Sequence, residues 1–317
     1  MKKVVLIALV LVMFGAVLSE AAGQKVALVG RISWCPDSDG AAGGNRDFDV
    51  MPHFSMVDET LDYLTQEWGY FPILMPDYVA QYMVNDGQDV EGRGYDMYVN
   101  PGIYMAQPDF FQMNNYDLIY VTGTCWSSIA PPLAEVPIPV IMGEHSCVGT
   151  RAKLGSLGMF HGESSGDHNG FDTIVLTEEG KSHPLTAGMP DEIVVWGDGP
   201  DGPPENPGAA WNGLHDDVYS AAEGTVVLAV WADNPDQAAL AVTDEGGALA
   251  GDYTAPARRV MPFCNGGAVR PENGSELPPV WVTTWDYLTD DGTELMQRTY
   301  RWAMGEDPTP VTKWAQK

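Results

Sequence analysis

The chain has 317 residues, with 44 acidic side chains against 16 basic ones and a formal net charge of −28. A surface this acidic repels nucleic acid and anionic membranes, because both need neutralisation by Lys and Arg. We therefore expect no nucleic-acid partner, and the sequence points to no cofactor. The charge favours a protein that stays soluble in an extracellular or salty medium.

The N-terminal residues, MKKVVLIALVLVMFGAVLSEAAG, carry two lysines, an apolar run from Val4 to Leu18 and small residues after it. This pattern predicts a signal peptide over residues 1–21. The apolar run is short for a membrane span, and no other segment approaches the ~20 apolar residues that a stable span needs. We expect a secreted or periplasmic protein whose residues 22–317 form one domain, with an insertion over about residues 77–108.

The cysteines form an even set in this chain, namely Cys35, Cys125, Cys147 and Cys264. Disulfides are the default for an exported protein. No CxxC pair exists, so a structural zinc site has little support. The sequence predicts disulfides and leaves their pairing open.

Strand and helix signals alternate in the first half of the chain. Apolar runs predict strands at residues 25–29 and 70–74, the second split by Pro72 and therefore near a sheet edge. Helical spacing predicts a helix between them, over about residues 56–68, that ends at Gly69. Two shorter runs, 118–121 and 139–142, are typical of strands buried on both faces of a parallel sheet.

The second half is richer in strand signals. After a short helical piece near residues 150–157, we expect strands at 171–177, 192–196 and 258–263, and a hairpin of 225–232 with 238–243. Residues 181–188 suit a turn, and apolar side chains along one face predict a closing helix over 291–305. This order predicts an α/β fold whose mainly parallel sheet carries an antiparallel extension.

Ligands of open α/β sheets bind beyond the carboxyl ends of the strands. Right-handed crossovers place the ends of the first, third and fourth strands at one edge of the sheet. The polar segments 122–128 and 143–149 follow two of these strands, so we expect the functional site there. The cysteines also follow strand ends, which predicts up to two disulfides beside the same crevice.

Several segments, in order, resemble the class I glutamine amidotransferase-like superfamily: YDLIYVTG from Tyr116, IPVIMGE from Ile138, SHPLTAGMP from Ser182, TDEGG from Thr243, APARRVMPF from Ala255 and DGTELMQRTYRWAMG from Asp291. Within it, the chain is similar to exported bacterial proteins of unassigned function and, more distantly, to trehalose-utilisation (ThuA-like) proteins. The resemblance covers nearly all of residues 22–317. It implies a flavodoxin-like three-layer sandwich.

The catalytic residues of the superfamily do not carry over. In its amidotransferases a sharp turn after a strand bears the nucleophilic cysteine, and the resemblance places Glu144 at that position, with Cys147 three residues later. The His-x-Glu pair of a glutaminase is missing downstream, and His161-Gly-Glu163 comes too early in the chain. A thiol nucleophile needs a positioned base and a depressed pKa. We therefore expect no glutaminase activity.

Glu144 and His145 are the catalytic candidates, because a carboxylate beside an imidazole suits acid–base chemistry. The alternative is that Glu144 is a structural acceptor, capping a short helix or pairing with an arginine. His145, His161 and His168 are minority candidates for a metal site, together with Glu163 and Asp167. Their spacing is looser than that of known metal motifs.

The ligand-binding candidates are Trp34, Thr124, Trp126, Ser146, Arg258 and Arg259. The two tryptophans suit a sugar ring or ordinary packing, and the arginines suit a polar ligand or internal pairing. We expect a non-catalytic domain that binds a small polar ligand, with carbohydrate as one class. A hydrolase that uses Glu144 and His145, with or without a metal, is the alternative. A structural part of a cell-surface assembly is a third. The oligomeric state stays open.

Overall fold

The computed structural model describes residues 23–30, 59–76, 112, 115–122, 133–149, 157–162, 167–169, 171–197, 208–210, 220–264, 266–269, 280–283 and 285–309. The predicted signal peptide, the 77–108 insertion and nearly all of the helical piece near 150–157 lie outside these residues. In the described part of the chain, no helix has the length and apolar character needed to cross a membrane.

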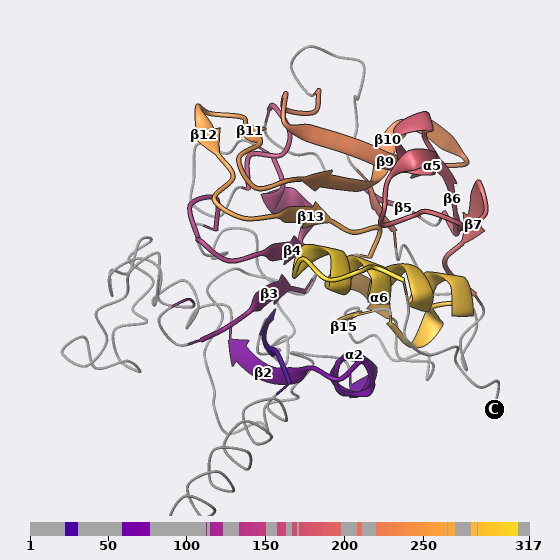
Figure 1. The fold of residues 1–317 in the computed structure, drawn as a ribbon. Helices are drawn as coiled ribbons and strands as arrows, with labels where there is room; N and C mark the ends of the chain where they lie inside the picture. The colour runs from indigo at the N-terminus through magenta and orange to yellow at the C-terminus, as the bar shows by residue number, and fades with distance from the viewer. Residues whose placement is uncertain are drawn as a thin grey trace, which may run out of the picture.

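A nine-stranded sheet forms the centre of the protein, in the order β2-β1-β3-β4-β13-β10-β9-β6-β7 (Figure 1). Its first five strands run parallel to one another: β2 (Phe71–Pro76), β1 (Lys25–Gly30), β3 (Leu118–Val121), β4 (Val140–Met142) and β13 (Arg259–Met261). Counted along the chain this is the order 2-1-3-4-5 of the flavodoxin-like fold. The predicted α/β fold class is confirmed.

The other four strands of the sheet form the predicted antiparallel extension: β10 (Asn234–Thr243), β9 (Thr225–Trp231), β6 (Thr173–Leu176) and β7 (Glu192–Val194). The predicted hairpin is β9–β10, with irregular pairing near its turn. Among the described residues, three small antiparallel pairs lie outside the main sheet: β5–β8 (Asp167–Asn169, Gly208–Ala210), β11–β12 (Ala248–Leu249, Tyr253–Thr254) and β14–β15 (Gly266–Val269, Val280–Thr283).

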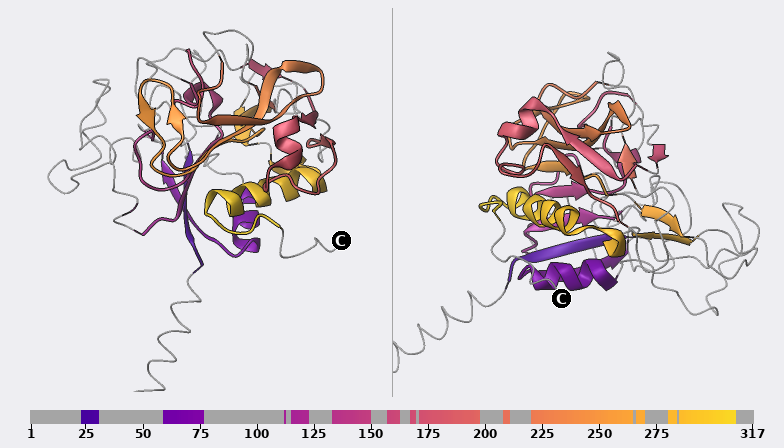
Figure 2. Two further views of the ribbon diagram at one scale, coloured as in Figure 1. Left: turned by 45° about the horizontal axis from the view of Figure 1, so that its top comes forward. Right: turned by 90° about the vertical axis from the view of Figure 1, so that its right-hand side faces the viewer.

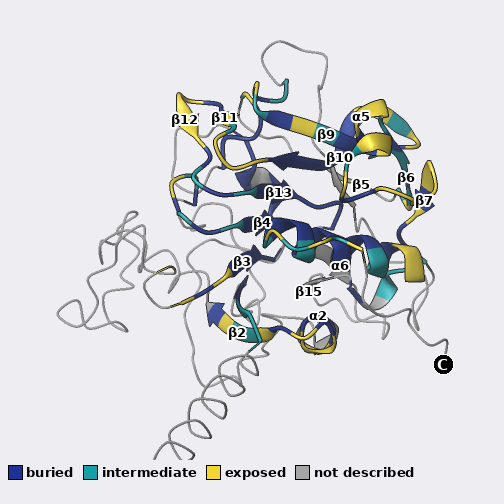
Figure 3. Ribbon diagram, viewed as in Figure 1, coloured by how far each residue is buried: buried dark blue, intermediate teal, exposed yellow. Residues whose placement is uncertain are grey.

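Both faces of the sheet are covered by buried apolar side chains. Val26 and Leu28 of β1 pack in one cluster with α2 (Glu59–Glu67) and α6 (Asp290–Ala303), while Ala27 and Val29 belong to a second cluster. Alternate residues of a strand point to opposite faces, so the two clusters lie on opposite sides. Figure 2 shows α2 and α6 together on one side, and Figure 3 shows the central strands buried along their length.

The helices follow the sequence prediction with one exception. The first predicted helix is α2, followed by Gly69 with a left-handed φ of 89°, and the closing helix is α6, followed by Gly305 with a φ of 81°. The exception is α5 (Glu178–Ser182), a short helix where the sequence indicated a strand end and a turn. Only five residues long, α5 is too short to show helical periodicity.

Two of the helices begin with the same threonine cap. Thr177 accepts a hydrogen bond from the Gly180 N–H (3.0 Å), and Thr289 accepts one from the Gly292 N–H (2.9 Å). Each hydroxyl also donates to a strand carbonyl, of β9 at 2.8 Å and of β7 at 2.6 Å. One side chain thus satisfies an open helix N–H and fixes the helix to the sheet.

The glycine in each cap lets the helix approach a strand closely. A Cβ on Gly180 would lie 1.9 Å from the Leu228 carbonyl oxygen, and one on Gly292 would lie 2.4 Å from that of Val195. Neither contact is sterically allowed, and the obstructing atoms belong to backbone. Glycine is therefore required at both positions.

The edge formed by β2 is protected by prolines. The Phe71 N–H donates inward to the Gln24 carbonyl (2.8 Å), so alternate residues, Pro72, Leu74 and Pro76, direct their backbone outward. Proline has no N–H, which leaves Leu74 as the outward donor of this strand. The prediction that Pro72 marks an edge strand is confirmed.

The opposite edge, β7, is covered by the segment that leads into α6. Trp196 and Leu288 form an isolated antiparallel bridge, and the Thr289 hydroxyl donates to the outward Val194 carbonyl. Outward backbone groups at the β7 edge therefore form hydrogen bonds within the chain instead of facing solvent unpaired.

Candidate functional site

The parallel strands β1, β3, β4 and β13 end at one edge of the sheet, which we call the carboxyl rim. The Thr122 N–H donates to the Val29 carbonyl (2.8 Å), and the Gly143 N–H donates to the Val121 carbonyl (2.7 Å). The backbone ladder therefore continues one residue past β3 and β4. The prediction that the first, third and fourth strands end together is confirmed.

Glu144 and His145 follow β4 at this rim and open the 3₁₀ turn η2 (His145–Cys147). The Glu144 carbonyl accepts from the Cys147 N–H (2.9 Å), and the His145 carbonyl accepts from the Val148 N–H (3.1 Å). The two side chains are largely withdrawn from solvent, with Glu144 9 % and His145 2 % exposed. A carboxylate and an imidazole are thus adjacent in sequence at a largely buried turn.

The backbone at Glu144 lacks the strain of a nucleophile elbow. Such an elbow presents its nucleophile from a sharp, strained turn. In the described part of the chain, the non-glycine residues with left-handed φ are Asn115 (57°) and Asp252 (64°), both far from the rim in sequence. Three residues later, Cys147 is fully buried in the second core cluster. The geometry therefore presents no thiol to a substrate at this turn.

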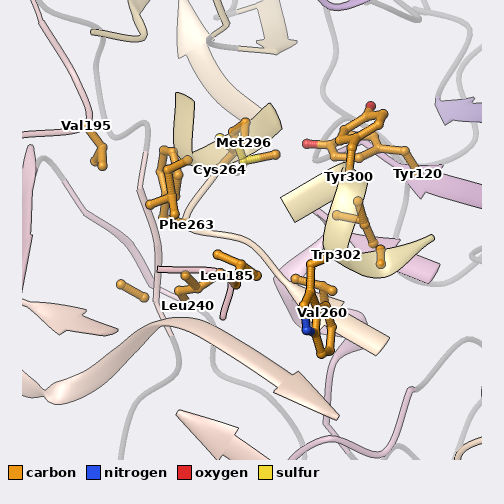
Figure 4. Close-up of a cluster of buried hydrophobic side chains, with 14 of the residues drawn as sticks. Tyr120, Leu185, Val195, Leu240, Val260, Phe263, Cys264, Met296, Tyr300 and Trp302 are labelled. Carbon is orange, nitrogen blue, oxygen red and sulfur yellow. The ribbon is translucent and has the colours of Figure 1, made fainter. Parts of the chain in front are cut away.

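Cys264 follows β13 at the same rim but points into the core. It is fully buried as a free thiol, and burial raises its pKa well above the ordinary value. Figure 4 shows it beside Phe263 and Met296. The disulfide predicted for Cys264 is not present, because packing against α6 turns its side chain away from the rim. Cys147 lies in the cluster on the other face, and Cys35 and Cys125 lie outside the described residues.

Arg259 lies at the opposite edge of the sheet, the amino rim. It pairs in register with Val140, the first residue of β4, whereas Glu144 follows the last. Its buried guanidinium donates to the carbonyls of Ile138 (2.9 Å) and Val136 (2.5 Å), and burial lowers its pKa to about 9. The prediction that Arg259 binds a ligand at the crevice is wrong, because this side chain is fully buried and holds the segment that enters β4.

Arg258 is also held at the amino rim by internal contacts. Its Nε donates to Asp244 (3.2 Å), its Nη1 donates to the Trp302 carbonyl, and its guanidinium lies 4.6 Å from the Trp302 ring centroid. The His183 ring lies 5.3 Å from the same indole. In the structure both arginines therefore pair with groups of the protein itself, which is the alternative to ligand binding that the sequence left open.

The remaining candidates are only partly described. Trp34, Thr124 and Trp126 lie outside the described residues, and so do the side chains of Ser146, His168 and Asp167. His161 is exposed, in contrast to the buried His145. Among the side chains that the structure does describe, no three His, Cys, Asp or Glu groups are arranged to hold a metal ion.

Thr122 is the first residue of the predicted site segment 122–128, although Thr124 is the threonine of that segment that the sequence predicts as a ligand-binding candidate. It is fully buried and follows β3 at the point where the strand order reverses between β1 and β3. Ligand crevices of doubly wound sheets lie at such switch points. The sequence signal for Thr122 as a site residue is its position as the first polar residue after the apolar run of β3.

The strand order and the rim define this protein as an α/β domain of the flavodoxin-like class. No protein-family model matches the chain, and no curated protein matches it. Similar solved structures include the following two. The cytoplasmic protein STM3548 from Salmonella typhimurium is 13% identical, with a TM-score of 0.37, over 68% of this chain and 78% of that one. The "putative gmp synthase subunit a protein" of Thermoplasma acidophilum is 9% identical, with a TM-score of 0.31, over 90% and 98%.

Proposed function

We propose that this protein is an exported, non-catalytic amidotransferase-like domain that binds a small polar ligand, of the carbohydrate class, at the carboxyl rim. The observation that carries the proposal is the identity and geometry of the elbow residue. The resemblance to the amidotransferase superfamily places Glu144 at the position of the nucleophile, and the backbone of Glu144 is not left-handed.

A carboxylate at a largely buried rim suits a ligand rich in hydroxyl groups. A glutamate carboxylate accepts hydrogen bonds only, and hydroxyl groups donate them. Charge-assisted hydrogen bonds are stronger than neutral ones, and burial strengthens them further. Trp34 and Trp126 follow β1 and β3 in the sequence. Their aromatic faces would stack on the apolar faces of a sugar ring.

Isothermal titration calorimetry with a panel of neutral mono- and disaccharides tests the proposal. We expect one class to bind and Glu144→Gln to weaken its binding about tenfold or more, because hydrogen bonds to charged groups contribute ~1.5–3 kcal/mol. The matched control is Glu179→Gln, an exposed carboxylate on α5. Equal affinity of the Glu144→Gln variant, or no binding across the panel, contradicts the proposal.

The second candidate is a hydrolase in which Glu144 and His145 perform acid–base chemistry. Their adjacency at a largely buried turn favours it. Chromogenic glycosides and esters, assayed with and without a chelator, separate the two functions. The hydrolase requires turnover that Glu144→Gln and His145→Gln each abolish. Binding without turnover by the unaltered protein eliminates it.

A further inference from the structure

Five buried aromatic side chains form a connected cluster away from the carboxylate turn: Trp68, Tyr70, Tyr120, Trp285 and Tyr300. Trp68 and Tyr70 lie in the connection between α2 and β2, and the other three come from β3, η3 (Trp285–Tyr287) and α6. Each is at most 9 % exposed. We call this set the aromatic cluster, and Figure 4 shows the rings of Tyr120 and Tyr300 beside each other.

The rings of the aromatic cluster are separated by short and similar distances. Trp285 lies 6.0 Å from Trp68 and 5.7 Å from Tyr120, measured between ring centroids. Tyr300 lies 5.1 Å from Trp68, 5.7 Å from Tyr120 and 5.9 Å from Tyr70. No step exceeds the contact range of aromatic pairs, so the rings form a continuous path of readily oxidised side chains.

The members of the path differ in whether they can lose a proton. Burial raises the pKa of all three tyrosines, Tyr70, Tyr120 and Tyr300, and within the described residues no carboxylate accepts a hydrogen bond from the Tyr300 hydroxyl. Tyr70 instead donates its phenolic hydrogen to the Glu306 carboxylate (3.3 Å). Glu306 is 26% exposed at its side chain and pairs with Arg301 at 3.2 Å.

We propose that the aromatic cluster carries one-electron oxidising equivalents out of the core and discharges them at the Tyr70–Glu306 pair. A one-electron oxidising radical takes an electron from Trp285 and is itself reduced. Trp68 then donates an electron to oxidised Trp285. Tyr70 in turn donates an electron, through Tyr300, to oxidised Trp68. As Tyr70 loses its electron, its phenolic proton passes to the Glu306 carboxylate. The products are a neutral Tyr70 radical and a protonated Glu306.

The proton acceptor decides where the path ends. An oxidised phenol is a strong acid, so a tyrosine without a base within hydrogen-bond reach holds the oxidised state poorly. An oxidised indole can keep its proton, and the Trp68 Nε1–H has no acceptor among the described residues. The oxidised state therefore crosses Trp68 and comes to rest at Tyr70, beside Glu306, whose side chain is 26% exposed.

Pulse radiolysis with azide radicals, which oxidise indoles, tests this path on the full chain. Indolyl absorption should decay into tyrosyl absorption, and a nitroxide trap followed by peptide mass spectrometry should label Tyr70. In Tyr70→Phe the label is lost and the indolyl decay slows several-fold. Glu306→Gln keeps the ring but slows the transfer several-fold, because it removes the base.

Tyr63 supplies the matched control. It lies on α2 beside Glu67, is 51% exposed and contacts no ring of the cluster among the described residues. Tyr63→Phe should leave the kinetics unchanged, and near-ultraviolet circular dichroism should show that every variant is folded. Labelling that follows exposure, with Tyr63 ahead of Tyr70, overturns the proposal. So does an unchanged indolyl decay in folded Tyr70→Phe.

Discussion

The guanidinium of Arg258 lies 4.6 Å from the centroid of the Trp302 ring and also donates a hydrogen bond to the Trp302 carbonyl. Trp302 is in the last turn of α6, where the carbonyl groups of a helix lack intrahelical partners. A cation there also complements the helix dipole. One side chain thus joins the start of β13 to the end of the closing helix.

Replacing Arg258 by Met keeps the aliphatic stem and removes both contacts. We expect the free energy of unfolding in urea to fall by about 1–2 kcal/mol. Asp244→Asn is the control, because it removes the exposed ion pair with Arg258 and should cost less than ~1 kcal/mol. Equal losses in the two variants would show that the ion pair, not the contact with Trp302, stabilises this corner.

Acidification should weaken the same corner through His183. Burial lowers the pKa of His183 below the ordinary 6.5; Asp244 acts in the opposite direction, and Arg258 in the same one. The fold therefore stabilises neutral His183. Its Nδ1 accepts from the Leu185 N–H (3.2 Å), a bond that protonation of Nδ1 would break.

This contribution to stability is present above about pH 6.5 and declines as the pH falls below that value. We expect the free energy of unfolding of the unaltered protein, minus that of His183→Asn, to shrink on acidification from about pH 7.5 to about pH 5. Taking the difference removes the titration of the many surface carboxylates. A difference that stays constant or grows would contradict the prediction.

The cap at Thr289 offers a sharper test of helix docking. Thr289→Val removes the hydroxyl that serves both Gly292 and the β7 carbonyl, and we expect a loss of about 1–2 kcal/mol in the free energy of unfolding. Thr289→Ser keeps the hydroxyl and should lose less than half as much. If both variants lose the same amount, the methyl group rather than the hydroxyl stabilises the cap.

Salt should stabilise this protein. The six described basic residues all contact other groups of the chain: Lys25, Lys181, Arg258, Arg259, Arg298 and Arg301. The formal net charge of −28 already counts all 16 basic residues, so the excess acidic side chains repel one another. Raising NaCl from ~0.1 M to ~1 M shortens the screening length from ~10 Å to ~3 Å and weakens that repulsion.

We expect the thermal midpoint to rise steadily over this range of NaCl concentration. Sodium sulfate at equal ionic strength separates screening from the exclusion of salt from the protein surface. A midpoint that is flat or falls in NaCl would show that the acidic surface does not limit stability.

Pro72 should act against association through the open edge of the sheet. Pro72→Val adds an outward N–H and a strand-forming residue to β2. We expect sedimentation velocity to show concentration-dependent association of this variant. Pro184→Ala, at an exposed position outside the sheet, is the control. A monodisperse Pro72→Val variant would mean that the edge is protected by something other than this proline.

The parallel half of the sheet was predictable because its signals are local. Leu118–Val121 and Val140–Met142 are short apolar runs between polar residues, and such runs indicate buried strands wherever they occur. The threonine caps show the limit of local signals. Thr177 and Thr289 begin T-E-E-G and T-D-D-G and cap helices, whereas T-D-E-G from Thr243 is a turn in which Gly246 has a φ of 81°.

The positions of the two arginines were not predictable for a different reason. Arg258 and Arg259 stand at the start of a strand, and which rim that start occupies depends on the direction of the strand. Next to β4, an antiparallel strand would have placed them near Glu144. β13 runs parallel to β4, so they lie at the far edge. Direction depends on pairing between segments distant in the chain, which composition does not reveal.

β13 joins the two halves of the sheet, since it pairs with β4 on one side and with β10 on the other. It is also the last strand of this sheet to be synthesised. The hairpin β9–β10 can form from neighbouring residues as soon as they are available, but the parallel strands stay incomplete until residues 259–261 insert between the halves. Pairings so distant in sequence form slowly and leave strand edges open meanwhile. A chain that is synthesised N-terminus first would therefore complete this sheet only after residues 259–261 have emerged from the ribosome.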